Sequence, residues 1–237
     1  MSKPFVFKQF TVEQDKCAMK IGTDAVILGS WVNLKNKPSS ILDIGAGTGV
    51  LALMLAQRSY AELIDAIEID EKAYEQCVGN FENSTWNDRL FCYHASLEEF
   101  TEEIEDKYDL IVSNPPFYSE DYKSKNKKRD LARFEDALPF KHLIESVSIL
   151  LEKNGAFHVV IPYKYEIKFL ELSKKHKLFP NKILHLKGTP ETNIKRSFIE
   201  LSRVETDITI NELIIETSRH NYTKDYIELT KDFYLKM

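Results

Sequence analysis

Short apolar runs alternate with longer segments of helical periodicity along the chain after residue 40. Short, mostly apolar runs, which are typical of buried strands, occupy residues 40–45, 62–69, 89–94, 108–113 and 156–162. The segments between them, at 50–58, 71–81, 96–104 and 139–153, are predicted to be helices, and Gly155 is placed to help end the last one. Alternation of strand and helix predicts a mostly parallel sheet with helices on both faces.

The last part of the chain breaks this alternation. A helical segment at 164–176 is followed by two strands, 182–188 and 197–205, with no helix between them. We therefore predict an α/β fold with a doubly wound, Rossmann-like sheet of seven strands, mostly parallel with one antiparallel edge strand. Residues 1–38 are expected to form an N-terminal extension, and residues 39–237 the main domain.

Composition and charge narrow the possible functions. The length of 237 residues and the apolar fraction of 43% fit one domain. The net charge of −5 argues against a protein that coats nucleic acid non-specifically. A local basic run at 122–133 is nevertheless notable, because it directly follows a double proline. Such runs are usually solvated surface, and residues 174–177 form a second basic concentration.

Other sequence signals are weak. No apolar run is long enough to cross a membrane and the first residues do not form a signal peptide, so we expect a cytoplasmic protein. Cys17, Cys77 and Cys92 stand far apart and the histidines lack metal-ligand spacing, so we expect reduced structural thiols and no metal.

The first predicted strand ends in a glycine-rich turn, Asp43–Val50, directly before a helix. Such a turn lets a ligand approach the backbone. Gly45, Gly47 and Gly49 do not match the dinucleotide spacing, which needs glycine or alanine three positions after the second glycine. No Gly-Lys-Ser/Thr follows either, so the spacing favours a mononucleoside ligand.

An acid follows the second strand. Glu68 lies where a carboxylate reaches the two hydroxyls of a ribose. Asp70 is expected to cap the next helix. Alone, Glu68 would be a weak signal, but together with the glycine turn it predicts a nucleoside site.

The fourth strand ends in Ser-Asn-Pro-Pro-Phe-Tyr, residues 113–118. The side-chain carbonyl of Asn114 and the main-chain carbonyl of Pro115 can both accept hydrogen bonds from an amino group whose lone pair is delocalised. Pro115 and Pro116 would fix these carbonyls, and Phe117 can stack on a flat substrate. The motif therefore indicates methylation of an amine on a base or an amide.

These three strand ends together resemble a class I S-adenosylmethionine-dependent methyltransferase. Residues 5–31, 42–58, 113–118 and 221–237 resemble the bacterial valine-tRNA (adenine-37 N6)-methyltransferase family, over nearly the whole chain. The resemblance implies S-adenosyl-L-methionine as cofactor and N6 methylation of an adenine in the anticodon loop of a tRNA. The reaction that this resemblance implies requires no metal, no membrane and no second subunit.

The resemblance also implies roles for individual residues. The N-terminal extension would cover the cofactor and substrate site. Asn114, Pro115, Pro116 and Phe117 would be catalytic. The cofactor would bind Lys20, Thr23, Asp24, Asp43, Gly45, Ala46, Gly47, Gly49, Glu68, Ile69, Ser96 and Leu97. The RNA would bind Phe117, Tyr118, Lys127, Lys128, Arg129 and Arg133. Ser96 departs from the family, which often has an acid there to accept from the cofactor adenine.

Three other functions share parts of this pattern. A glutamine methyltransferase of translation factors and a guanine-N2 methyltransferase of ribosomal RNA use nearly the same strand-end motif. A non-catalytic nucleoside-binding module would keep the motif idle. The basic run after Phe117 and the C-terminal resemblance favour tRNA, while Asn114, Pro115 and Phe117 together argue against the idle module.

Overall fold

A sheet of eight strands forms the centre of the computed structural model, which describes residues 3–115 and 140–237. The order of its strands is β10-β8-β9-β7-β6-β3-β4-β5. Their bounds are β3 Ser40–Ile44, β4 Leu63–Glu68, β5 Leu90–His94, β6 Tyr108–Ser113, β7 Leu151–Pro162, β8 Phe179–Lys187, β9 Arg196–Ser202 and β10 Thr209–Ile214.

Neighbouring strands of this sheet are parallel except where β9 pairs with β7 and β8. This confirms the predicted α/β class, with a mostly parallel sheet and one antiparallel strand. Two details of the prediction are corrected. The described sheet has eight strands instead of seven, and β9 is not outermost because β8 and β10 lie beyond it.

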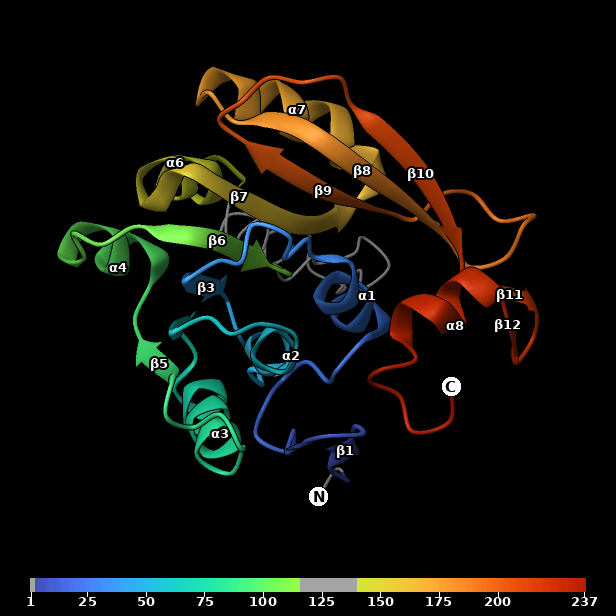
Figure 1. The fold of residues 1–237 in the computed structure, drawn as a ribbon, viewed down its shortest axis with the longest axis horizontal. Helices are drawn as coiled ribbons and strands as arrows, with labels where there is room; N and C mark the ends of the chain where they lie inside the picture. The colour runs from blue at the N-terminus through green and yellow to red at the C-terminus, as the bar shows by residue number, and fades with distance from the viewer. Residues whose placement is uncertain (1–2, 116–139) are drawn as a thin grey trace, which may run out of the picture.

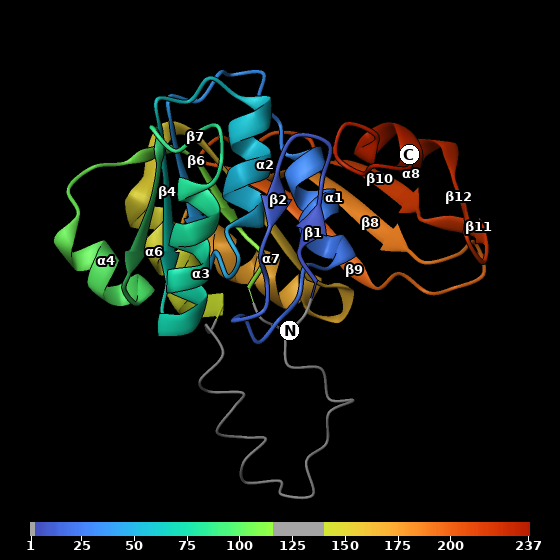
Figure 2. The ribbon, with the colours of Figure 1, turned by 90° about the horizontal axis from the view of Figure 1, so that it is seen from below.

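Helices cover both faces of the sheet (Figure 1). One face carries α1 (Thr23–Trp31), α2 (Val50–Arg58) and α3 (Glu71–Glu82), and Figure 2 looks onto this side. The other carries α4 (Leu97–Glu103), α6 (Phe140–Leu150) and α7 (Glu166–Lys175), with the 3-10 turn η1 (Tyr163–Tyr165) before α7. Each layer of helices buries its own hydrophobic cluster against the sheet.

The predicted helix at 139–153 ends early in the structure. It stops at Leu150, and Leu151 begins β7, so Gly155 lies inside a strand and does not end the helix. A Cβ atom on Gly155 would lie 3.0 Å from the carbonyl oxygens of Tyr108 and Asp109, where the pairing of β6 with β7 shifts register. Glycine permits this close approach of two backbones.

The two ends of the described chain pack together. The hairpin of β1 (Phe5–Val6) and β2 (Thr11–Val12) contacts the segment after α8 (Lys224–Thr230), where the Lys8 amide donates to the Phe233 carbonyl at 2.9 Å. A short pair of strands, β11 (Glu216–Ser218) and β12 (Asn221–Tyr222), precedes α8. The N-terminal segment shares one buried cluster with the sheet, which includes Phe10, Val26 and Leu110.

Candidate active site

The three predicted motifs meet at one edge of the sheet. β3 lies between β4 and β6, and Ile44 is in register with Ile67 on one side and with Ser113 on the other. Neighbouring strands are about 5 Å apart, so the glycine turn after β3 lies directly between Glu68 and Asn114. The topology therefore confirms that these strand ends converge at the carboxyl edge of the sheet, where such folds bind ligands.

The glycine turn is open at two positions and packed at the third. Gly45, Gly47 and Gly49 have φ angles of 73°, 56° and 78°, which side chains strongly disfavour. A Cβ atom on Gly45 or Gly47 would meet nothing within 4 Å, whereas one on Gly49 would lie 2.5 Å from the Phe81 ring. Gly45 and Gly47 thus leave room for a ligand against the backbone, and Gly49 packs the turn against α3.

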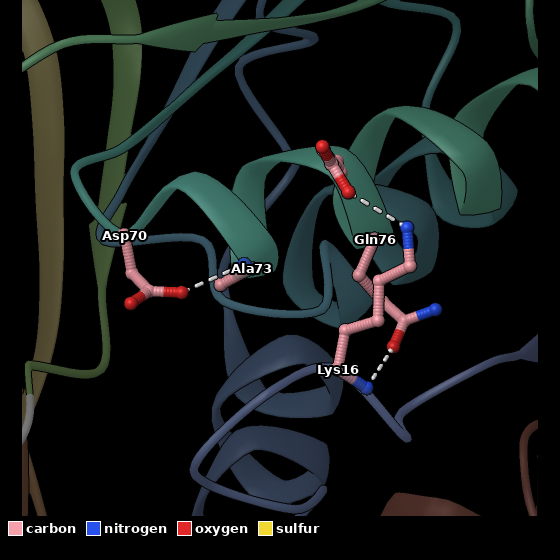
Figure 3. A network of polar contacts seen from close by, with 5 residues as sticks. Lys16, Asp70, Ala73 and Gln76 are labelled. Carbon is pink, nitrogen blue, oxygen red and sulfur yellow. Dashed lines mark hydrogen bonds and ion pairs between the residues drawn. The ribbon is translucent and has the colours of Figure 1, made fainter.

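Glu68 ties the glycine turn to the end of β4. Its Oε2 accepts from the Gly47 amide at 2.8 Å and its Oε1 accepts from the Asp70 amide at 2.9 Å. A carboxylate has about four acceptor positions, so both oxygens can still accept from ribose hydroxyls. Asp70 caps α3 by accepting from the Ala73 amide at 2.9 Å, as predicted (Figure 3).

Asp43 is fully buried beneath the turn. Its Oδ2 accepts from the Ala52 amide at 3.2 Å, and its buried Oδ1 has no hydrogen-bond partner in the described structure. Burial raises the pKa of Asp43 to about 7; the Ala52 amide opposes this shift and the charge of Glu68 adds to it. Asp43 Oδ1 lies beside the open glycine turn and has no partner among the described residues. It therefore suits a ligand that carries hydrogen-bond donors or a positive charge.

Asn114 and Pro115 directly follow β6 and are the described part of the predicted catalytic motif. The residue before them, Ser113, is fully buried, and its hydroxyl donates to the Ile44 carbonyl at 2.9 Å. This bond fixes the end of β6 to the end of β3. Asn114 is thereby held beside the glycine turn, and the ring of Pro115 restricts the φ angle of that residue.

Two polar side chains of α3 hold the N-terminal segment beside the glycine turn. Asn80 bonds both main-chain groups of Glu13 and also donates to the Thr48 carbonyl at 2.8 Å. Gln76 Oε1 accepts from the Lys16 amide at 2.7 Å (Figure 3). Both α3 side chains are buried. These contacts attach the N-terminal segment beside the turn, and its role as a cover for the site stays a prediction.

Lys20 and Asp24, both predicted to bind the cofactor, already have partners. The Lys20 ammonium donates to the carbonyls of Gln14 and Cys17, the latter at 3.0 Å, and so closes the loop before α1. Asp24 Oδ2 lies 2.8 Å from Nε of Arg196 at the start of β9. Thr23 begins α1 and is exposed. The pair of Asp24 and Arg196 links α1 to the far half of the sheet along the carboxyl edge.

Ser96, Ile69 and Leu97 lie near the ends of β4 and β5. Ser96 caps α4: its hydroxyl accepts from the Glu99 amide at 3.1 Å, and Glu99 Oε2 accepts from the Ser96 amide at 2.9 Å. This explains the residue type at position 96 structurally. Ile69 is 69% exposed and Leu97 is buried, so Ile69 offers the apolar surface at this end of the site.

Several predicted site residues lie outside the described residues. They are Pro116, Phe117, Tyr118, Lys127, Lys128, Arg129 and Arg133. The second basic concentration is described, and it lies at the opposite edge of the sheet. α7 starts next to the carboxyl end of β7 and ends at Lys175, just before β8 begins at the amino edge. Lys174, Lys175 and Lys177 are therefore remote from Asn114.

Sequence reasoning missed the residues that assemble the site through long-range contacts. Asn80 and Gln76 are four positions apart on the buried side of a helix, which is the one local signal they give. Ser113 and Arg196 give no such signal, because their partners belong to distant segments.

A metal site and a membrane-spanning helix are both absent from the described part of the chain. Within residues 3–115 and 140–237, three or more His, Cys, Asp or Glu side chains do not come together in a way that could hold a metal ion. In the same residues no helix has the length and apolar character needed to span a membrane.

Comparison with known proteins agrees with this fold. The sequence model of the methyltransferase small domain family matches residues 21–178. A predicted O-methyltransferase from Agrobacterium tumefaciens has the same fold, with a TM-score of 0.69 at 18% identity over 89% of this chain and 96% of that one. The fold and the three strand-end motifs define a class I methyltransferase.

Full-length relatives identify the family more closely. A Flavobacterium johnsoniae protein named tRNA1(Val) (adenine(37)-N6)-methyltransferase is 62% identical over 98% of this chain and 100% of its own length. A Christiangramia forsetii protein of the same name is 59% identical over 100% of this chain and 99% of its own. The chain belongs to the tRNA1(Val) (adenine(37)-N6)-methyltransferase family.

Proposed function

We propose that this enzyme transfers a methyl group from S-adenosyl-L-methionine to N6 of adenine 37 in a valine tRNA. The observation that carries the proposal is the position of Asn114 beside the open glycine turn, at the ends of two neighbouring parallel strands. The names of the full-length relatives support the substrate. A tRNA substrate also supports a cytoplasmic location.

The described residues fit this cofactor. Gly45 and Gly47 leave open space against the backbone, Asp43 offers a buried acceptor, and Glu68 offers carboxylate oxygens for ribose hydroxyls. S-adenosyl-L-methionine supplies an electrophilic methyl group on a sulfonium when it is bound. Ile69 gives an apolar surface suited to the adenine of the cofactor. The acidic side chains of Asp43 and Glu68 suit the positive charge of its sulfonium.

The residues after β6 supply the chemistry on the substrate side. An exocyclic amine is a poor nucleophile, because its lone pair is delocalised into the ring. The Asn114 side-chain carbonyl and the Pro115 main-chain carbonyl accept hydrogen bonds from this NH₂ group and so favour a lone pair directed at the methyl group. Since β6 is fixed to β3 through Ser113, little reorganisation is needed.

Methylation assays with separate substrate pools test this function. We expect labelled S-adenosyl-L-methionine to label a valine tRNA transcript and not a matched transcript with guanine at position 37. Ribosomal RNA and a release factor serve as the other pools. Labelling of ribosomal RNA at guanine N2, or of a glutamine in the release factor, would replace the proposed substrate. Cofactor binding without transfer to any pool would favour a binding module.

A further inference from the structure

The carboxyl edge continues from Asn114 onto the neighbouring strand, β7. Val159 of β7 is in register with Ser113, and β7 runs on to Pro162. Tyr163 follows directly, so it lies one strand from Asn114 and about 10 Å farther along the strand direction. This distance is short enough for a nucleotide next to a bound adenine to reach it.

The Tyr163 ring is both accessible and firmly supported. It is 41% exposed, and its centroid lies 5.1 Å from that of His185 at an interplanar angle of 82°. His185 Nε2 is 2.7 Å from Glu166 Oε2, which also accepts from the Ser197 hydroxyl. The Tyr163 amide donates to the Lys195 carbonyl at 3.1 Å. Support from two strands and a helix fixes the ring and lowers the entropy cost of stacking on it.

An open groove of about 610 Å³ adjoins this ring, within the size range of ligand pockets. Besides Tyr163 it is lined by Lys187 and the β8–β9 loop, Pro190–Ile194. Lys187 is paired with Glu212 at 2.8 Å, and Lys195 is exposed next to the loop. Glu191 is the acid in the lining. An exposed ring with two lysines suits a base and its phosphate better than it suits a purely apolar partner.

We propose that Tyr163 is a stacking platform for an RNA nucleotide that flanks the target adenine, with Lys187 and Lys195 near its phosphate. The proposal rests on the proposed function, because it places one part of the tRNA on this enzyme. Sequence tolerance is expected, since every base offers a face for stacking. The platform would hold the anticodon loop while the adenine enters the site beside Asn114.

Substitution of Tyr163 tests the platform. We expect Tyr163→Ala to lower kcat/KM for a valine tRNA by roughly 5-fold to 150-fold, mainly through a higher KM. Tyr163→Phe keeps the ring and should retain nearly full activity. Tyr60→Ala is the matched control, because Tyr60 is fully exposed but lies between α2 and β4 at the opposite edge. Cofactor affinity, measured by calorimetry, should be unchanged in all three variants.

A cycle with modified RNA locates the contact. Transcripts that lack the base at position 36 or at position 38 are compared with the intact tRNA. At one of these positions, loss of the base should lower kcat/KM of the unmutated enzyme as much as Tyr163→Ala lowers it with the intact tRNA. With that same transcript, Tyr163→Ala should cause no further loss of kcat/KM. Unchanged KM in a folded Tyr163→Ala variant, or losses that add fully at both positions, would overturn the platform while leaving the proposed function intact. If the unmutated enzyme neither binds nor methylates RNA, both proposals fail.

Discussion

Asn80 holds both main-chain groups of Glu13: its Oδ1 accepts from the Glu13 amide at 2.8 Å and its Nδ2 donates to the Glu13 carbonyl at 2.9 Å. The same Nδ2 donates to the Thr48 carbonyl in the glycine turn at 2.8 Å. One buried amide therefore joins the N-terminal segment, α3 and the turn. The extension is thereby attached to the site that it is predicted to cover.

Asn80→Ala should lower the free energy of unfolding by about 1–3 kcal/mol, because it leaves buried main-chain groups without partners. Chemical denaturation measures this change. Asn83→Ala is the matched control, since Asn83 is exposed and donates only to the Gly79 carbonyl of its own helix among the bonds described. It should change the free energy by no more than about 0.5 kcal/mol. Equal effects of the two substitutions would contradict the joining role of Asn80.

Asp43 should make the stability of the cofactor-free protein depend on pH. Its pKa rises from 3.8 to about 7 on folding, so the folded state binds more protons than the unfolded state between these values. The free energy of unfolding should therefore fall as pH rises from about 4 to about 7, by at most about 1.4 kcal/mol per pH unit from this group. Above pH 7 its effect should be constant.

Asp43→Asn removes the titrating group and keeps an acceptor for the Ala52 amide. The difference in unfolding free energy between this variant and the unmutated protein should thus change across the interval from about pH 4 to about pH 7. Denaturation curves at several pH values measure the difference. A difference that stays constant with pH would show that Asp43 does not titrate in this range.

Glu68→Ala should weaken binding of S-adenosyl-L-methionine by about 1.5–3 kcal/mol, because charge-assisted hydrogen bonds to the ribose are removed. The change also frees the Gly47 amide, which loosens the turn. Calorimetry gives the affinity, and circular dichroism checks the fold. Glu71→Ala, an exposed neighbour at the start of α3, should bind normally. Normal binding by a folded Glu68→Ala variant would remove Glu68 from the cofactor site.

Asn114→Ala should abolish most turnover while the cofactor still binds. The Asn114 carbonyl is expected to orient the attacking amine most strongly in the transition state, so its loss should lower kcat by roughly 100-fold to 1000-fold. Single-turnover methylation of a valine tRNA measures this step. Near-normal single-turnover rates would exclude the proposed role.

The sequence was sufficient to predict those parts of the fold whose burial is periodic or continuous. β3, β4 and β6 are short, mostly apolar runs, and their parallel order brings the three motifs together. α1 was missed because it is buried on nearly all sides, so its apolar residues show no helical period. β10 was missed because most of its residues are exposed at the edge of the sheet.

Long-range polar contacts explain why the site was less predictable than the fold. Local sequence gives no sign that Asp24 pairs with Arg196 or that Ser113 bonds Ile44. Ser96 looked like a substitute for an acid that accepts from the cofactor, but its hydroxyl serves a capping box at α4. A serine after a strand can cap a helix or bind a ligand, and the residue type alone does not distinguish these two roles.

RNA binding by the basic run after the predicted catalytic motif stays a prediction, because the run lies outside the described residues. If Lys127 and Lys128 bind tRNA phosphates, their replacement by alanine should weaken RNA binding but not cofactor binding. The slope of log affinity against log salt should fall by about 0.7–0.9 for each phosphate that is no longer neutralised.

Lys174→Ala with Lys175→Ala is the matched control, since these lysines end α7 at the edge opposite Asn114. Arg129 and Arg133 can contribute more, because a guanidinium binds phosphate through two donors. An unchanged salt slope and kcat/KM in the Lys127/Lys128 variant would assign this run to solvated surface, and a changed slope in the control would place RNA across the opposite edge.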